Sequence, residues 1–193
     1  MHKYAKRKNI KQLYIFNKNY IVNRNEKETM KEKIICDTRE RLPLWKNKDI
    51  IVRKLDAGDY SIEGTDPVTN KPYEEIIGLE RKSIADAYGT FGRGHDRFKR
   101  ELERAKDFAY FAIVIEGSYS RVLDKDFPMS HKVFMKGESL VKIASMLEVK
   151  YGVPVHYFVN RLELKKWIIT TFDCFVRYRT QLAIDLNKSM SEN

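Results

Sequence analysis

One stretch, residues 58–86, constrains the fold of this chain more than any other. Two apolar, alternating segments flank a polar connection, residues 64–74, which contains Pro67, Asn70 and Pro72. This pattern predicts two β-strands joined by a turn-rich loop. Charged residues interrupt the apolar segments, and burying a charge is costly unless it is paired or bound to a metal. The stretch therefore predicts a β-sheet that carries a charged site.

Four charged residues accompany these predicted strands: Asp59 on the first, and Glu80, Arg81 and Lys82 on the second. Side chains on a strand alternate between its faces, so Glu80 and Lys82 share one face and Arg81 takes the other. Asp59 can then approach Glu80, and two carboxylates near one point form a site for a hard divalent cation. A lysine beside them can orient a water molecule. The combination predicts phosphodiester hydrolysis, although each residue by itself is more often structural.

Strand and helix patterns alternate along the chain, which predicts an α/β fold. Strands are expected at residues 33–38, 50–55, 59–62, 75–81, 110–115 and 153–159, and helices at 84–88, 96–107, 138–150 and 162–186. The run at 110–115 is apolar throughout and predicts a central strand covered on both faces. Ser83 is expected to cap one helix and Gly152 to end another. Residues 118–136 show no clear pattern.

The charged residues also carry a resemblance to the XPF-type family of structure-specific DNA endonucleases. The family signature is Asp-x-Arg-Glu, then Gly-Asp, then Glu-Arg-Lys-x-x-x-Asp, and every position is present. The matching residues are Asp37-Thr38-Arg39-Glu40, Gly58-Asp59, and Glu80-Arg81-Lys82 followed by Asp86. The resemblance covers roughly residues 33–182. It implies a restriction-endonuclease-like fold, in which helices flank a central mixed β-sheet.

The resemblance also implies roles for the candidate catalytic residues. We expect Asp59 and Glu80 to bind Mg²⁺ or Mn²⁺ through their carboxylates, with Asp37 joining the metal site through water. Lys82 would position the attacking water. The residues expected to fix the geometry are Arg81 and Asp86, with Asp86 within reach of Arg81 or Lys82.

Three neighbouring charged residues also have a structural interpretation. The resemblance implies that Arg39 and Glu40 support Asp37 at the edge of the metal site. The alternative is that they form a salt-bridged pair that holds their loop, and we favour this alternative for Glu40. Glu116 follows the apolar run at 110–115 and is interpreted as a solvated strand end rather than as a part of the metal site.

Residues 89–95 contain three glycines and lead into the helix expected at 96–107. Amides at a helix N-terminus favour a phosphate. The basic residues predicted to contact DNA here are Arg93, His95, Arg97 and Arg100. The competing interpretation is an ordinary solvated basic face with Phe98 and Leu102 turned inward, and we expect some of both.

The composition narrows the class of partner. The 193 residues carry a formal net charge of +10 and the pI is near 9.5, which suits a polyanion such as DNA. No apolar run approaches the length of a membrane span, and no secretory signal is evident. The two cysteines, Cys36 and Cys174, fit a reducing compartment. We therefore expect an intracellular protein, cytoplasmic or nucleoid-associated, that is not secreted.

The chain is expected to divide into a basic N-terminal extension, residues 1–32, a nuclease domain, residues 33–187, and a tail, residues 188–193. The extension is either an arm that follows phosphates and stacks bases or a poorly ordered terminus, and Met30 is an alternative start. Many family members carry tandem helix-hairpin-helix motifs after the nuclease domain. This sequence shows no glycine-containing hairpin there, which leaves its preferred DNA structure open.

The final predicted helix, residues 162–186, carries more apolar surface than one face needs. A stripe about 100° wide suffices for packing on a sheet. The apolar residues are Leu164, Trp167, Ile168, Ile169, Phe172, Phe175, Val176, Tyr178, Leu182 and Ile184. The surplus predicts an interface, either in a homodimer or in a heterodimer with a related subunit. The alternative is that residues 118–136 fold back and cover the second face.

Together these features predict a metal-dependent endonuclease that hydrolyses phosphodiester bonds. Its expected substrate is branched, flap or single-strand-containing DNA in repair, recombination or replication. The alternative is a non-catalytic nucleic-acid-binding subunit that uses the nuclease fold as a scaffold for a partner. RNA is not distinguished from DNA by the sequence.

Overall fold

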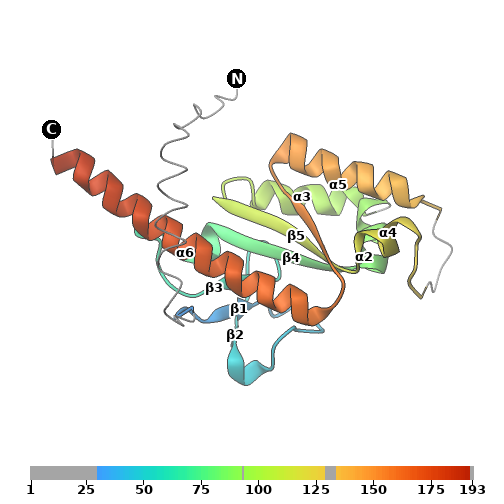
Figure 1. Ribbon diagram of the computed structural model, residues 1–193, viewed down its shortest axis with the longest axis horizontal. Helices are drawn as coiled ribbons and strands as arrows, with labels where there is room; N and C mark the ends of the chain where they lie inside the picture. Colours follow the sequence, from blue (N-terminus) through green and yellow to red (C-terminus); the bar gives the residue numbers. More distant parts are fainter. Residues whose placement is uncertain (1–29, 93, 129–133, 192–193) are drawn as a thin grey trace. The chain divides into compact units, whose positions relative to one another are not determined.

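The computed structural model describes residues 30–92, 94–128 and 134–191 (Figure 1). The chain separates into two units, Met1–Lys31 and Glu32–Asn193. The expected basic extension therefore lies almost entirely outside the described residues. All the helices and strands named below belong to the second unit.

The second unit is built on a mixed sheet of six strands within the described residues, in the order β2-β1-β3-β4-β5-β6. The strands are β1 (Ile34–Cys36), β2 (Ile51–Val52), β3 (Tyr60–Ile62), β4 (Ile77–Ser83), β5 (Tyr110–Glu116) and β6 (Val155–Phe158). β3 runs antiparallel to both β1 and β4, whereas the pairs β1–β2, β4–β5 and β5–β6 are parallel. The two longest strands, β4 and β5, lie side by side near the middle of the sheet.

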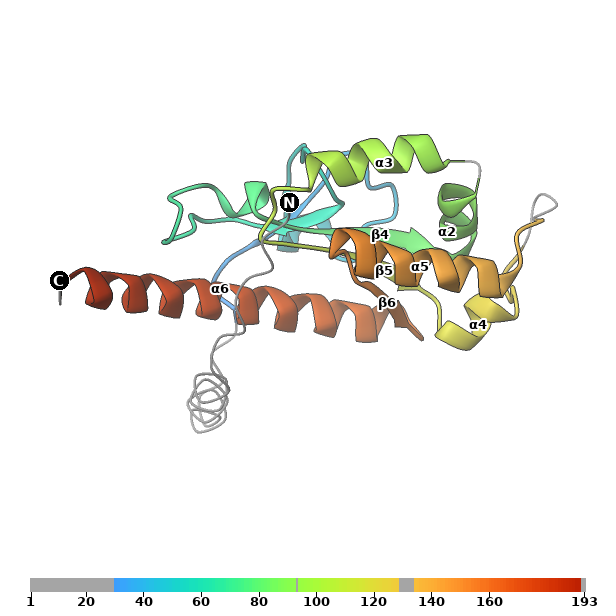
Figure 2. The same ribbon diagram turned by 90° about the horizontal axis from the view of Figure 1, so that it is seen from above.

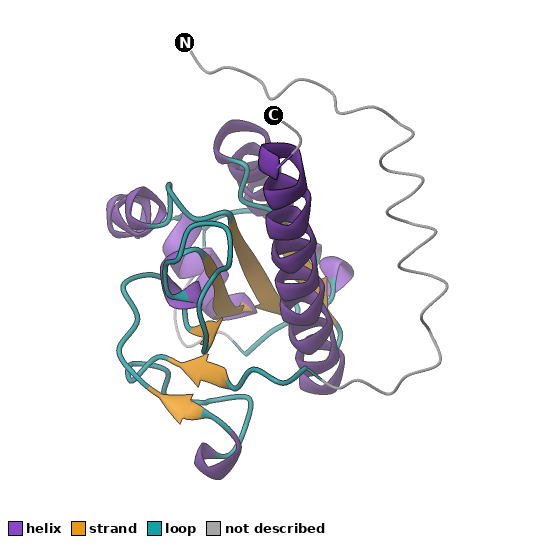
Figure 3. Ribbon diagram, turned by 90° about the vertical axis from the view of Figure 1, so that its left-hand side faces the viewer, coloured by secondary structure: helices purple, strands orange, loops and turns teal. Residues whose placement is uncertain are grey.

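Helices cover both faces of this sheet. They are α2 (Ile84–Phe91), α3 (His95–Arg104), α4 (Tyr119–Leu123), α5 (Gly137–Tyr151) and α6 (Arg161–Ser191), with short 3-10 turns η1 (Asn47–Asp49) and η2 (Tyr73–Glu75). Figure 2 shows α3 and α6 on opposite sides of the sheet, and Figure 3 shows helices on both sides of the strands. The arrangement is the restriction-endonuclease-like α/β fold that the sequence predicts.

Apolar side chains explain this layering. One core, on the side of α2, α3 and α5, joins Phe111, Ile113 and Ile115 of β5 to buried residues such as Phe98 and Leu140. On the other side, the apolar face of α6 is fully buried; it comprises Leu164, Ile168 and Phe172. β5 is therefore covered on both faces, as its continuous apolar run predicts.

Local signals set the ends of several helices. The Ser83 side chain accepts the N–H of Asp86 at the start of α2, and Gly152 ends α5 in a left-handed conformation. Both expected caps are confirmed. The predicted strands and helices are found, with boundaries that shift by a few residues, and α6 extends farther than expected, to Ser191.

The segment that showed no pattern, residues 118–136, contains the short helix α4. In its described part, α4 packs against α5 rather than against α6. Along α6, exposed apolar side chains remain, among them Leu162, Ile169 and Ile184. Within the described residues, no helix is long and apolar enough to cross a membrane.

Candidate active site

Backbone contacts fix Asp59 between β1 and β4. Gly58 precedes it with a φ of +79°, and a Cβ at Gly58 would lie 3.1 Å from the carbonyl oxygen of Leu79. Glycine is needed because this backbone conformation and this close approach leave no room for a side chain. The N–H of Asp59 donates to the Leu79 carbonyl at 2.8 Å, and its own carbonyl accepts the N–H of Asp37 at 2.8 Å. The Asp59 side chain therefore starts from a rigid position.

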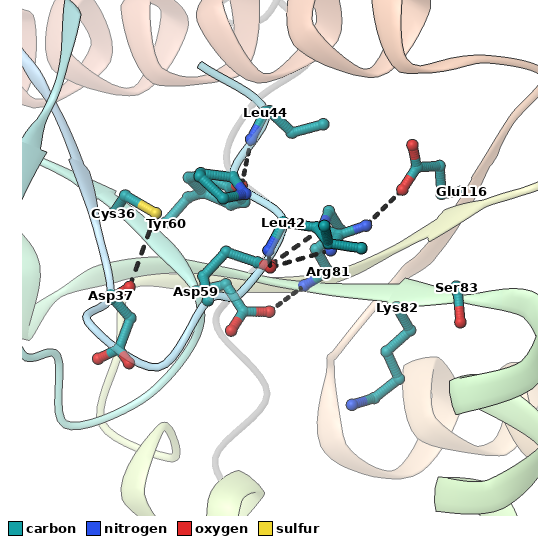
Figure 4. Close-up of polar contacts among 12 residues, drawn as sticks. Cys36, Asp37, Leu42, Leu44, Asp59, Tyr60, Arg81, Lys82, Ser83 and Glu116 are labelled. Atoms are coloured by element: carbon teal, nitrogen blue, oxygen red, sulfur yellow. Dashed lines mark hydrogen bonds and ion pairs between the residues drawn. The ribbon is translucent and has the colours of Figure 1, made fainter. Parts of the chain in front are cut away.

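The Asp59 carboxylate is close to β4, and the residue is half-buried. Its Oδ2 accepts the backbone N–H of Arg81 at 2.8 Å (Figure 4). Burial, together with the negative charge of Glu40, raises the pKa of Asp59 from 3.8 to about 7. A carboxylate in this setting favours a proton or a cation, so the site is suited to positive charge.

Glu80 and Lys82 form a buried pair on the same face of β4, as strand alternation predicts. Lys82 Nζ donates to Glu80 Oε1 at 2.7 Å, and the two residues are only 7% and 8% exposed. Burial and the neighbouring Asp59 carboxylate raise the pKa of Glu80 well above its usual value. Burial opposes the charge on Lys82, but the Glu80 carboxylate outweighs it and raises the pKa of Lys82. The lysine ammonium also lies 5.5 Å from the centre of the Phe98 ring on α3.

Arg81 points to the opposite face of β4, where it is held by two carboxylates. Its Nε and Nη2 donate to the two oxygens of Glu40, each at 3.0 Å, and its Nη1 donates to Glu116 (Figure 4). The Arg81 side chain is 9% exposed. Glu40 and Glu116 raise the pKa of Arg81 against the opposing effect of burial. Arg81 is therefore a paired, fully charged group that is not free to leave its position.

These contacts correct two expectations. Glu40 does not pair with Arg39 but with Arg81, because the loop after β1 lies over the face of β4 to which Arg81 points. Glu116 is not a solvated strand end, because it is turned toward Arg81 and its side chain is only 18% exposed.

Asp37 organises the loop after β1. One of its oxygens accepts the backbone N–H and the Nε of Arg39 at 2.7 and 2.6 Å. The other accepts Arg39 Nη2 at 3.0 Å and the Leu55 N–H at 2.6 Å. Burial alone would raise the pKa of Asp37, but these hydrogen bonds lower it. Each oxygen of Asp37 already has two donors.

The described residues contain no group of three or more His, Cys, Asp and Glu side chains arranged to hold a metal ion. The structure therefore does not bring Asp37 together with Asp59 and Glu80 as a three-ligand set. The two carboxylates whose electrostatics favour a cation are Asp59 and Glu80.

Asp86 takes part in a helix cap. Its Oδ2 accepts the Ser83 hydroxyl at 2.6 Å, and its N–H donates to the same hydroxyl at 3.1 Å. In the described part of the chain, Asp86 makes no hydrogen bond with Arg81 or Lys82, and its contacts are at an exposed helix start. Its observed contacts are those of a capping residue.

The predicted DNA-contacting residues are only partly described. Arg93 lies outside the described residues, as do the side chains of His95 and Arg97. On α3, Arg100 is exposed, whereas Phe98 and Leu102 are buried, so the helix has the basic outer face and apolar inner face that were expected.

One residue near the site was missed by sequence reasoning. Glu101 lies one turn after Phe98 on α3, and its negative charge contributes to the raised pKa values of Asp59, Glu80 and Lys82. The available signal was its i+3 spacing from Phe98, which is the residue of α3 that contacts Lys82.

Comparisons with known proteins identify the family and the fold of the chain. The family model of the ERCC4 domain matches residues 26–171. The chain is similar to XPF from Aeropyrum pernix solved in complex with DNA, with 19% identity and a TM-score of 0.50, over 78% of this chain and 66% of that chain. It is also similar to XPF from Aeropyrum pernix at 17% identity and a TM-score of 0.51, over 77% and 69% of the two chains. No curated protein matches the chain. The matches confirm the resemblance to XPF-type nuclease domains and the shared fold.

Proposed function

The chain belongs to the ERCC4 domain family, and from this premise we propose that it is a divalent-metal-dependent endonuclease that hydrolyses phosphodiester bonds in DNA. The observation that carries the proposal is the grouping of Asp59, Glu80 and Lys82: Lys82 donates to Glu80 and both are buried, and the half-buried Asp59 next to them accepts the backbone N–H of Arg81. Few structural roles require two neighbouring carboxylates with raised pKa values and one lysine on the same sheet.

The residues present fit a divalent cation. Asp59 and Glu80 would hold Mg²⁺ or Mn²⁺, because both are carboxylates whose surroundings favour added positive charge. When bound, such a cation supplies an activated water and stabilises charge on the transferring phosphoryl group. That Asp37 contacts the cation through a water molecule at the edge of this site stays a prediction.

Three further side chains would position the reacting groups and the metal ligands. Lys82, held by Glu80 at 2.7 Å, would place the attacking water or the phosphate next to the carboxylates. Arg81 would keep its own backbone N–H aimed at Asp59, because its guanidinium is anchored on both sides. Asp86 would help to fix the geometry of the site through the cap that it forms with Ser83 at the start of α2.

DNA is the proposed substrate because the chain carries a net charge of +10 and exposes Lys99 and Arg100 on α3, the helix that covers the site. The similar XPF structure from Aeropyrum pernix was solved in complex with DNA. Branched, flap or single-strand-containing DNA in repair, recombination or replication is the proposed setting. Arg93, His95 and Arg97 stay predicted contacts.

The second candidate is a non-catalytic nucleic-acid-binding subunit. One observation favours it: both oxygens of Asp37, a residue of the family signature, are occupied by hydrogen bonds from Arg39 and Leu55. The two candidates differ in cleavage, so one assay separates them.

We further propose that α6 pairs two chains, as a homodimer or in a heterodimer with a related subunit. Leu162, Ile169 and Ile184 are 62%, 38% and 43% exposed. At about 100° per residue they lie within about 60° of one another on α6. Phe172, in contrast, is fully buried against the sheet. Ile184→Glu should therefore dissociate a dimer in light scattering without unfolding the chain, and a monomeric wild type at micromolar concentration would refute the homodimer.

The testing experiment uses purified full chain on labelled single-stranded, duplex, flap and junction DNA and on matched RNA, with Mg²⁺, Mn²⁺ or a chelator. We expect cleavage of at least one DNA substrate that stops in the chelator. Binding without cleavage on every substrate, in both metals, would favour the non-catalytic subunit.

A further inference from the structure

Arg161, the first residue of α6, joins three segments that are far apart in the sequence. Its Nη2 donates to the carbonyl oxygens of Leu42 and Pro43, each at 2.8 Å. Its Nε lies 3.3 Å from Glu116 Oε1 at the end of β5. The start of α6 is thereby tied to the loop after β1 and to the central sheet.

The position of Arg161 is unfavourable for the helix itself. A cation at a helix N-terminus opposes the helix dipole. The capping is done by Asn160, whose Oδ1 accepts the N–H groups of Leu162 and Glu163 at 2.9 and 3.0 Å. Since Arg161 contributes nothing to the cap, its contribution must come from the contacts that its guanidinium makes.

Those contacts continue to the proposed active site. Glu116 uses its second oxygen to bind Arg81, and Arg81 binds Glu40 with its other nitrogens. The backbone N–H of Arg81 then donates to Asp59. These residues form a row of alternating charges, in the order Arg161, Glu116, Arg81 and Glu40, in which two arginines balance two glutamates. Exposure falls from 43% at Arg161 to 18% at Glu116 and 9% at Arg81, so the row leads from solvent into the protein.

We infer that Arg161 is a positioning residue for the proposed nuclease site, acting through Glu116 and the loop at Leu42 and Pro43. It holds Glu116 against Arg81 and holds the loop so that Glu40 meets the other side of the guanidinium. Arg81 then stays fixed, and its N–H keeps the Asp59 carboxylate in place. The inference rests on the proposed function, because it assigns Arg161 to the geometry of that site.

The test compares Arg161→Gln and Arg161→Lys with Lys166→Gln, an equal loss of charge at an exposed position of the same helix. Calorimetry measures Mn²⁺ affinity, and steady-state cleavage separates kcat from KM. We expect Arg161→Gln to lower Mn²⁺ affinity or kcat by about 10-fold, the usual effect of a residue that supports a metal ligand. KM for DNA should not change. Arg161→Lys should show a smaller decrease than Arg161→Gln, since lysine keeps the positive charge but lacks the several donor nitrogens of the guanidinium. Lys166→Gln should behave as wild type.

Three results would overturn the inference. Arg161→Gln and Lys166→Gln could behave alike, or Arg161→Gln could leave Mn²⁺ affinity and kcat unchanged. Arg161→Gln could instead make the dependence of log K for DNA on log[salt] shallower by about 0.9, which would identify a phosphate contact.

Failure of the proposed function is seen separately, because the wild type would then neither bind Mn²⁺ nor cleave. Hydrogen exchange of the metal-free protein still tests the row of charges in that case. Arg161→Gln should speed exchange at residues 40–44 and at the Arg81 amide relative to Lys166→Gln. Equal exchange in the two variants would contradict the inference.

Discussion

The two faces of β4 carry charge in different ways. On the face toward α6, the arginines Arg81 and Arg161 are matched by the glutamates Glu40 and Glu116. The groups toward α3 include three carboxylates, Asp59, Glu80 and Glu101, and Lys82 is paired with Glu80. Arg39 also acts on Asp59 and Glu101, but its own ion pair is with Asp37. Figure 4 shows Arg81 and Glu116 on one side of the strand and Lys82 on the other.

This difference in charge balance suggests different roles for the two faces: one fixes the position of the strand, and the other is suited to binding a cation. A balanced buried network satisfies its own charges and fixes the strand, although such networks are costly to break. An unbalanced set retains a demand for positive charge, which is how a site for a cation differs from a structural ion pair. The same strand thus provides a face of matched ion pairs and a face whose electrostatics suit a cation.

The largest expected effect comes from removing a carboxylate from the unbalanced face. Asp59→Asn and Glu80→Gln should each abolish cleavage and leave DNA affinity largely intact, because the proposed phosphate contacts lie on basic residues elsewhere. Gel cleavage and fluorescence anisotropy measure the two properties. Cleavage at the wild-type rate by either variant would remove these carboxylates from the metal site.

The second effect concerns Lys82. Lys82→Met keeps much of the apolar stem and should slow cleavage by about 10²–10⁴-fold, as for other positioned groups. Its Mn²⁺ affinity should not fall, since the change makes the face more negative. A variant that loses metal binding or unfolds would show that Lys82 is structural.

Breaking the balanced face should cost stability. Arg81→Met leaves Glu40 and Glu116 without their buried partner, and the free energy of unfolding should fall by about 3–5 kcal/mol in urea denaturation. Arg53→Gln is the matched control, because the Arg53 side chain is 44% exposed in its pair with Glu74. That control should change stability by less than about 1 kcal/mol. Equal effects would mean that the Arg81 network is not a special support.

Whether a contact of the site could be predicted from the sequence depends on how far apart its two residues are along the chain. The Glu80–Lys82 pair follows from alternation on one strand, and the neighbouring Asp59 follows from the adjacent strand. The Arg81–Glu116 pair joins residues 35 positions apart, and it exists because the parallel pairing of β4 and β5 brings their ends together. The Arg161–Leu42 contact spans 119 positions and depends on where α6 begins.

The role of Asp37 also could not be predicted from the sequence. A motif states that an aspartate is present but not how many donors surround it. Four hydrogen bonds from Arg39 and Leu55 use both of its oxygens, and they depend on the fold of the loop after β1.

The last expected effect is a pH dependence of stability without metal. The folded pKa of Asp59 is raised from 3.8 to about 7, so the folded state binds more protons than the unfolded state between these values. The contribution of Asp59 to stability should therefore decline as pH rises from about 4 to about 7 and level off above. Urea denaturation of the wild type and Asp59→Asn across this range isolates that contribution. A difference between them that does not vary with pH would contradict the raised pKa.

The most direct test of the central claim is a calorimetric titration of the metal-free protein with Mn²⁺ at pH 7, in two buffers of different ionisation enthalpy. If the unbalanced face binds the cation, the wild type binds Mn²⁺ and releases protons, because the carboxyl of Asp59 has a pKa of about 7. Asp59→Asn and Glu80→Gln lose the binding, and Arg53→Gln retains it. Binding that survives both carboxylate variants, or no binding by the wild type, would contradict the account.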